Sequence, residues 1–319
     1  MRAIIYDGYG PPDVVKCKEV EKPAATDDEV LIKIRAASVN PLDWRMMSGK
    51  PFVGRLMAGL RKPRRRPGVD VAGHIEAVGK NVTQFKPGDE VFGNCRGAFA
   101  EYGCAKETAI ALKPRNATFE EAASVPVAGY TALQGLRKNA NVQPGQKVLI
   151  NGAAGGVGTF AVQIAKWLGA EVTGVCSSRN VQMVRSIGAD HVIDYTQEDF
   201  TTRPERYDVI FECVGNYTFA RMHPVLTPKG TLVLVGAPKD VSTMGFLVPL
   251  LRNAVRSQVS ILMARRNQAD LNTLRDLIET GTIKPVIDKR YRLCETRQAV
   301  TYCAEGHARG KVVITVAMT

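Results

Sequence analysis

A short apolar strand that runs into a glycine-rich loop and then into a helix constrains this chain more than any other feature. The stretch KVLINGAAGGVGTFAVQIAKWLGA occupies residues 147–170, with Ala153 in place of the usual first glycine. Gly155 leaves room for the backbone to approach a pyrophosphate, and Gly158 lets the helix pack closely on the sheet. The strand–loop–helix context predicts a dinucleotide site in which backbone amides at the positive end of the helix face the phosphates. The loop residues that we expect at the cofactor are Ala154, Gly155, Gly156, Val157 and Gly158.

The end of the second strand of this predicted sheet indicates which dinucleotide is bound. NAD-binding proteins normally carry an acidic residue about 20 residues after the loop, where it accepts hydrogen bonds from the ribose. This chain has Ser177, Ser178 and Arg179 at that point. Hydroxyl donors and one positive charge suit a 2′-phosphate, so the sequence favours NADP(H). The alternative is that Arg179 is an ordinary exposed residue at the start of a helix.

The pattern of apolar residues changes near residue 122, and this change predicts two domains. Up to residue 121, short β-rich runs between turns predict a compact β-barrel-like domain. From 122 to 264, near-continuous apolar runs alternate with helix-like stretches, which indicates a parallel doubly wound sheet. Residues 265–319 again mix strands with helices, and we expect them to complete the first domain. The predicted fold class is therefore α/β.

The formal net charge of the 319-residue chain is +12, and part of it lies in the run RKPRRR at 61–66. One interpretation is a patch that binds nucleic acid or phosphate. The other is a solvated loop stiffened by proline, whose field merely attracts anions. No aromatic side chain lies inside the run to stack on bases, so nucleic acid is not the expected partner.

The sequence shows neither the pattern of a membrane-spanning segment nor that of a signal peptide. The most apolar segment, 244–263, is interrupted by arginines and a proline, and we expect its apolar face at a dimer interface or over a ligand site rather than on a membrane. The N-terminal segment alternates like a strand and lacks the features of a signal peptide. The seven cysteines are scattered without a C-x-x-C pair. We therefore expect reduced, mostly buried thiols and a cytoplasmic protein.

The histidines and cysteines do not follow a metal-binding pattern. The four histidines stand at positions 74, 191, 223 and 307, with no H-E-x-x-H motif, and Cys95 and Cys104 are nine residues apart. Catalytic zinc needs three close ligands and an open position, and structural zinc usually takes four cysteines. The sequence therefore predicts no metal site.

Six segments, in this order, carry a family pattern, and the glycine loop is one of them: ASVNPLDWRMMSG (37–49), PGVDVAGHIEAVG (67–79), FKPGDEVFG (85–93), VPVAGYTALQGL (125–136), INGAAGGVG (150–158) and RGKVVITV (309–316). Over essentially its whole length the chain resembles the zinc-independent quinone oxidoreductase branch of the medium-chain dehydrogenase/reductase family. Zinc-dependent relatives have a cysteine near Asn40–Leu42 and a Gly-His-Glu through Val69–Val71, and this chain has neither. The resemblance implies a GroES-like β-barrel domain, a Rossmann domain, a homodimer, NADPH, and reduction of a quinone or an activated double bond.

The resemblance also implies functional residues. Asn40 and Asp43 look like residues that line the nicotinamide and substrate cleft, and Thr131 is similar to a threonine that lies against the nicotinamide. Tyr195 matches a tyrosine beside the adenosine phosphate. Lys311 either faces the cofactor or lies on a surface strand. The strand-end residues at positions where relatives contact the ribose and nicotinamide through the backbone are Val214, Gly215, Val235 and Gly236.

The chemistry implied by the resemblance requires that negative charge on a substrate oxygen be stabilised without zinc, which is a task for hydrogen-bond donors. The Asn40 amide is one candidate donor and the Tyr130 hydroxyl is another, although packing explains Tyr130 equally well. Asp43 is either a general acid or a residue that caps a turn or helix. We expect an NADPH-dependent quinone or enone reductase. The alternatives are a zinc-free alcohol dehydrogenase, and an NADPH-binding scaffold that uses its basic loop on nucleic acid.

Overall fold

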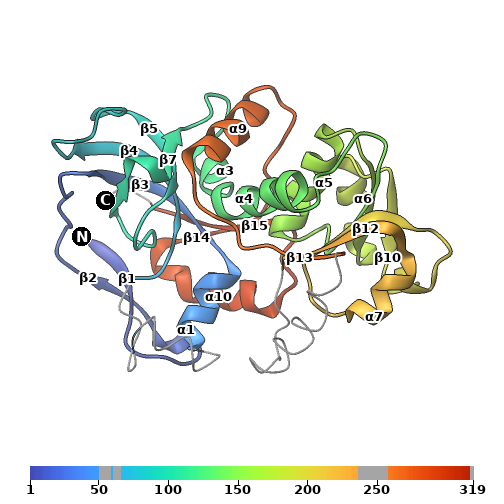
Figure 1. Cartoon of the computed structure of the whole chain (residues 1–319). Coiled ribbons are helices and arrows are strands. Elements are labelled where there is room, and N and C mark those ends of the chain that lie inside the picture. Colours follow the sequence, from blue (N-terminus) through green and yellow to red (C-terminus); the bar gives the residue numbers. More distant parts are fainter. Residues whose placement is uncertain (50–58, 60–65, 236–257, 317–319) are drawn as a thin grey trace. The chain divides into compact units, whose positions relative to one another are not determined.

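Each of the two units of this protein is built around a sheet of its own, as the computed structural model shows (Figure 1). The first unit comprises Met1–Val127, Arg266–Gly281 and Pro285–Thr319, and the second comprises Ala128–Arg265 and Thr282–Lys284. The structure describes residues 1–49, 59, 66–235 and 258–316. Three features expected from the sequence lie wholly or largely outside these residues: Gly236, the basic run 61–66 and the apolar segment 244–263.

The larger sheet of the first unit is mixed. Among the described residues its strands follow the order β14-β15-β3-β4-β5-β7, and β6 also pairs with β3. β14 and β15 run parallel, whereas the other neighbours run antiparallel. A separate antiparallel pair is formed by β1 and β2. The strand bounds are β1 (Arg2–Tyr6), β2 (Val15–Glu19), β3 (Glu29–Val39), β4 (Asp70–Val78), β5 (Glu90–Asn94), β6 (Tyr102–Lys106), β7 (Ile110–Leu112), β14 (Ile287–Arg292) and β15 (Lys311–Thr315).

The core of the first unit forms around β3, whose sequence EVLIKIRAASV is buried along almost its whole length. Because the side chains on both faces of β3 are buried, the strand carries apolar or small residues on both. Side chains from β4, β15 and α10 join it in one cluster, with Ile34, Val71, Val300 and Ile314 among its members. The helices of this unit are α1 (Pro41–Ser48), α3 (Phe119–Ala123), α9 (Gln268–Glu279) and α10 (Thr296–Glu305).

The sheet of the second unit is parallel throughout the part that the structure describes, with the order β10-β9-β8-β11-β12-β13. The order reverses direction between β8 and β11, and ligands bind at such a switch point, outside the carboxyl ends of the strands. No described helix, in either unit, is long and apolar enough to cross a membrane. The bounds are α4 (Pro126–Gln134), β8 (Lys147–Asn151), α5 (Gly156–Trp167), β9 (Glu171–Cys176), α6 (Val181–Ser186), β10 (His191–Asp194), β11 (Tyr207–Glu212), α7 (Phe219–Met222), β12 (Leu226–Leu234) and β13 (Val259–Ile261).

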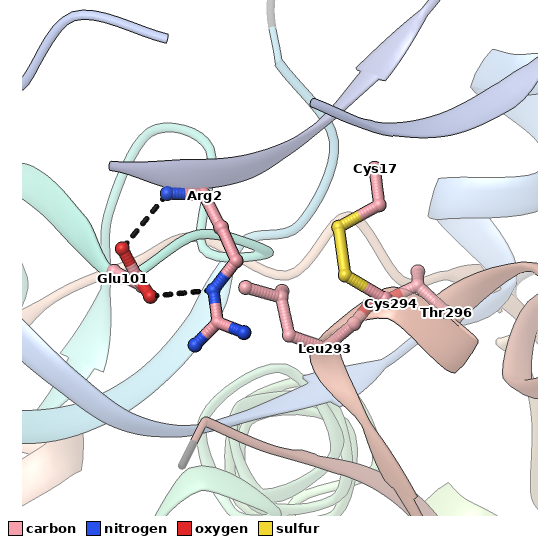
Figure 2. The surroundings of a disulfide bond; sticks show 6 residues. All are labelled: Arg2, Cys17, Glu101, Leu293, Cys294 and Thr296. Carbon is pink, nitrogen blue, oxygen red and sulfur yellow. Dashed lines mark hydrogen bonds and ion pairs between the residues drawn. A yellow bond between two sulfur atoms is a disulfide. The ribbon is translucent and has the colours of Figure 1, made fainter. Parts of the chain in front are cut away.

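A disulfide corrects the prediction that all seven cysteines are reduced. Cys17 in β2 is bonded to Cys294, in the short turn that precedes α10 (Figure 2). The two cysteines are 277 positions apart in the sequence, and no local pattern connects them. Cys294 is exposed and Cys17 is partly exposed, so solvent reaches the bond. The other five cysteines are free thiols, as expected: Cys95, Cys104, Cys176, Cys213 and Cys303.

Candidate functional site

The glycine loop of the second unit follows β8 and leads directly into α5. A Cβ atom added at Gly158 would lie 2.1 Å from the carbonyl oxygen of Gly152, so only glycine allows the helix to start this close to the loop. At Gly155 an added Cβ would meet only the Gly152 oxygen, at an ordinary 3.4 Å. Gly155 caps α5 without a side chain, and no acidic residue lies in the first turn. The start of the helix therefore suits an anionic pyrophosphate.

The end of β9 carries the residues expected at the 2′-phosphate. Ser177 is half-buried, whereas Ser178 and Arg179 are exposed. The Ser178 hydroxyl donates to the carboxylate of Asp194 at 2.5 Å, and this donor is the main reason that the pKa of Asp194 lies below its usual range. Tyr195, the next residue, is 54% exposed. Sequence reasoning missed Asp194 because it looked for a carboxylate only on the second strand of the sheet, and Asp194 ends the neighbouring strand β10.

A buried glutamate organises the loop after β11. Glu212 is fully buried, and its Oε1 accepts hydrogen bonds from the backbone amides of Val214 at 2.7 Å and Gly215 at 2.8 Å. Its Oε2 accepts from the Asn151 side chain at 2.8 Å. Burial raises the pKa of Glu212, and these donors oppose the rise. The amide of Val235, after β12, donates to the backbone oxygen of Glu212. An acidic residue inside the apolar run YDVIFECVG was the available signal for Glu212.

Two further residues of the second unit, Tyr130 and Thr131, lie inside α4. Tyr130 is 2% exposed and Thr131 is 9% exposed. Tyr130 is one of the largest fully buried side chains among the described residues, and its hydroxyl oxygen is buried too. This burial favours packing as the main task of Tyr130.

A polar cluster is buried in the first unit around Asn40, which stands before α1. The Asn40 amide donates to Asp70 at 2.9 Å and to the Ser38 carbonyl at 3.4 Å, and its oxygen accepts from the Lys311 ammonium at 2.7 Å. Lys311 is 3% exposed, so it does not lie on the surface of β15. Burial raises the pKa of Asp70, and the charge of Lys311 opposes the rise. The cluster therefore leaves Asn40 with no spare amide hydrogen for an oxyanion.

Asp70 connects this cluster to three other elements. Its carboxylate also accepts from the Ser38 hydroxyl at 3.1 Å, the Asn94 side chain at 2.8 Å and the Val127 amide at 3.2 Å. A fully buried carboxylate is stable only when it is hydrogen-bonded in this way. Sequence reasoning did not single out Asp70, because its partners come from positions far apart in the chain.

Asp43 has the capping role, one of the two that the sequence left open. Its carboxylate accepts from the backbone amide of Asn40 at 2.8 Å and so closes the first turn of α1. It is also 4% exposed, and burial raises its pKa to about 7. A carboxyl group with that pKa holds a proton over part of the neutral range and can release it.

Comparison with known proteins places the chain in a family. An alcohol dehydrogenase GroES-like domain matches residues 26–134, and a zinc-binding dehydrogenase domain matches residues 187–314. A chloroplastic quinone oxidoreductase from Triphysaria versicolor is 34% identical, over 98% of both sequences. The NADPH-dependent alkenal/one oxidoreductase of Arabidopsis thaliana is 34% identical, over 98% of this chain and 79% of the relative. The solved quinone oxidoreductase of Coxiella burnetii matches with a TM-score of 0.87 at 31% identity, and the match covers 99% of both chains.

The chain belongs to the quinone-oxidoreductase-like branch of the medium-chain dehydrogenase/reductase family. The expected fold class is confirmed: a GroES-like β-barrel domain together with a Rossmann doubly wound parallel sheet. One family model carries the name of a zinc-binding enzyme. In the described part of the chain, no three His, Cys, Asp or Glu side chains are grouped so that they could hold a metal ion.

Proposed function

We propose that this protein is an NADPH-dependent oxidoreductase that reduces quinones or α,β-unsaturated carbonyl compounds by hydride transfer without zinc. The observation that carries the proposal is the start of α5, which has neither a capping side chain nor an acidic residue in its first turn. The absence of a carboxylate at the end of β9 supports NADPH over NADH as the cofactor. Relatives named for quinone and for alkenal/one reduction support the class of acceptor.

In this proposal the second unit binds the cofactor, which supplies the hydride when it is bound. The amides of Gly156 and Val157 hold the pyrophosphate, and Ser177, Arg179 and Tyr195 hold the adenosine phosphate. Glu212 keeps the loop of Val214 and Gly215 in one conformation, because it fixes both amides. A loop held in this way presents its backbone to the ribose without a large entropic cost.

The first unit, in the same proposal, provides the substrate side. Lys311 and Asp70 fix the orientation of the Asn40 side chain. Asn40 therefore contributes a side chain in a fixed position, and it does not donate a hydrogen bond to the charged substrate oxygen. Asp43 holds a proton near neutral pH, because burial raises its pKa to about 7. In α4 of the second unit, Thr131 is the residue proposed to lie against the nicotinamide, and Tyr130 is assigned to packing.

A homodimer is the proposed assembly. Within the described residues, β13 is the edge strand of its sheet. Its last residue, Ile261, is 38% exposed, and Met263, two residues after the strand, is 83% exposed. Unpaired edge strands with apolar neighbours favour pairing with a second copy. Light scattering during size-exclusion chromatography distinguishes a dimer from a monomer.

The cytoplasm is the proposed location. The disulfide between Cys17 and Cys294 is the observation that weighs against it, because reducing compartments rarely keep such bonds. Fractionation of the source cells, followed by detection with an antibody, tests this location.

The oxidation of NADPH and of NADH, each measured with several acceptors, tests the proposed activity. The acceptors are 9,10-phenanthrenequinone, a 2-alkenal and a simple saturated aldehyde. We expect fast NADPH oxidation with the quinone or the alkenal, slow NADH oxidation, and no turnover of the aldehyde. Turnover of the aldehyde would instead favour the alcohol dehydrogenase alternative. Tight NADPH binding without turnover of any acceptor would favour the scaffold.

A further inference from the structure

The carboxyl ends of β9 and β10 bring an acidic residue to the place where a 2′-phosphate is expected. The two strands are parallel neighbours, and Asp194 pairs in register with Cys176, the last residue of β9. The side chains that follow both strands therefore emerge at the same edge of the sheet. The Asp194 carboxylate lies 2.5 Å from the Ser178 hydroxyl and 2.7 Å from the Thr196 hydroxyl.

The hydroxyl groups of Ser178 and Thr196 already donate their hydrogens to Asp194. A serine or threonine hydroxyl has one hydrogen to donate. Ser178 gives its hydrogen to one carboxylate oxygen of Asp194, and Thr196 gives its hydrogen to the other. The two hydroxyl oxygens are 2.9 Å apart, so a hydrogen bond between them would only remove one of these donors from Asp194. A phosphate group accepts hydrogen bonds and needs donors, and neither hydroxyl is available to it while the carboxylate holds both.

The charge of Asp194 acts in the same direction. Four donors surround the carboxylate: the two hydroxyls, the backbone amide of Thr196 and the side chain of Gln197. These bonds favour the ionised form and hold the pKa of Asp194 below its usual range, with Ser178 as the largest cause. At neutral pH the anionic carboxylate of Asp194 therefore lies beside Ser178, a residue expected to contact the 2′-phosphate. The 2′-phosphate itself carries between one and two negative charges.

We propose that Asp194 is a specificity residue that weakens binding of the cofactor's 2′-phosphate and so limits the preference of this protein for NADPH over NADH. Arg179 attracts the phosphate, and Asp194 repels it and withholds the hydroxyl of Ser178. This inference rests on the proposed function, because it assumes that the loop after β9 faces the adenosine end of the cofactor.

Equilibrium binding of two nucleotide fragments tests the inference without any turnover. The fragments are 2′,5′-ADP, which carries the 2′-phosphate, and 5′-ADP, which lacks it. Calorimetric titration of the purified protein near neutral pH and at fixed ionic strength gives the dissociation constant of each. The substitution Asp194→Asn keeps the size of the side chain and removes its charge. We expect it to tighten binding of 2′,5′-ADP about tenfold and to change binding of 5′-ADP by less than about twofold.

Asp199→Asn is a matched control. Asp199 accepts from the Thr201 amide at 2.9 Å and from the Thr201 hydroxyl at 2.8 Å, which is the same local pattern that Asp194 makes with Thr196. The substitution therefore changes the net charge equally and disturbs a similar turn. We expect the ratio of the two dissociation constants to stay at its wild-type value in this variant. A rise in the affinity for 2′,5′-ADP equal to that of Asp194→Asn would mean that net charge alone causes the effect, and would overturn the inference.

A double variant shows whether Ser178 transmits the effect. In Asp194→Asn the Ser178 hydroxyl is released, so adding Ser178→Ala should remove a large part of the gained affinity for 2′,5′-ADP. An unchanged or reduced affinity for 2′,5′-ADP in Asp194→Asn would overturn the inference while 5′-ADP still binds. Failure of both fragments to bind the folded wild-type protein would overturn the proposed cofactor as well. The two failures are thus distinguishable.

Discussion

The disulfide between Cys17 and Cys294 allows the strongest quantitative prediction about stability. The double substitution Cys17→Ser/Cys294→Ser removes a bond between residues that are 277 positions apart. In the loop-closure model, a cross-link over a loop of this length lowers the entropy of the unfolded chain by an amount worth about 5 to 6 kcal/mol at 25 °C. The bond joins β2 to the turn before α10, so the first unit should lose this stabilisation. We expect its melting temperature to fall by roughly 10 to 20 °C.

Calorimetric melting with and without a phosphine reductant measures this effect. Reductant should lower the transition of the wild-type protein and leave the double variant unchanged, which separates the disulfide from other effects of the reagent. Alkylation of the denatured, unreduced protein followed by mass spectrometry should label five of the seven cysteines. Seven labelled cysteines, or a double variant that melts at the wild-type temperature, would refute the reasoning.

Three further predictions concern single residues. Gly158→Ala should abolish binding of NADPH measured by fluorescence titration, because the new Cβ would lie 2.1 Å from the Gly152 oxygen; binding at wild-type affinity would show that the loop relaxes freely. Glu212→Leu should weaken NADPH and NADH to a similar extent, about tenfold, since it releases the amides of Val214 and Gly215. Burial raises the pKa of Asp43 to about 7, so between about pH 4 and pH 7 the folded protein keeps a proton that the unfolded chain releases, and stability falls as the pH rises. Urea unfolding between these pH values should show that the free energy of unfolding of Asp43→Asn falls by roughly 4 kcal/mol less than that of the wild type. An equal dependence of this free energy on pH in both proteins would contradict the raised pKa.

The fold could be predicted from the sequence because its main signals are local. The apolar run of β8, the glycine loop and the helix α5 are contiguous, and their order alone identifies a nucleotide-binding unit. The exact end of a helix is less predictable: α6 ends at Ser186, before Gly188 adopts a positive φ of 109°. Such ends depend on backbone conformation that composition indicates only roughly.

The site could be predicted only in part, because its charged partners are distant in the chain. Asn40 was a reasonable oxyanion donor from its sequence context, but Asp70 from β4 and Lys311 from β15 occupy its amide. Asp194 acts on Ser178 across two neighbouring strands. The bond between Cys17 and Cys294 had no sequence signal at all. The contacts of Asn40 and of Asp194 depend on strand order, and the disulfide depends on the packing of β2 against the turn before α10, so all of them become visible only in the folded chain.

The position of β15 has a consequence for how the protein is made. β15 (Lys311–Thr315) lies between β14 and β3 in the sheet of the first unit, and it carries the lysine that holds Asn40. During synthesis this strand leaves the ribosome after every other described strand, whereas residues 128–265 of the second unit emerge earlier and as one stretch. Domains generally fold as units as they leave the ribosome. The nucleotide-binding unit can therefore fold on the nascent chain, while the sheet of the first unit lacks the strand beside β3 until residues 311–315 have emerged. Chains truncated before residue 311 should accordingly accumulate with a folded second unit and a first unit that chaperones and proteases recognise.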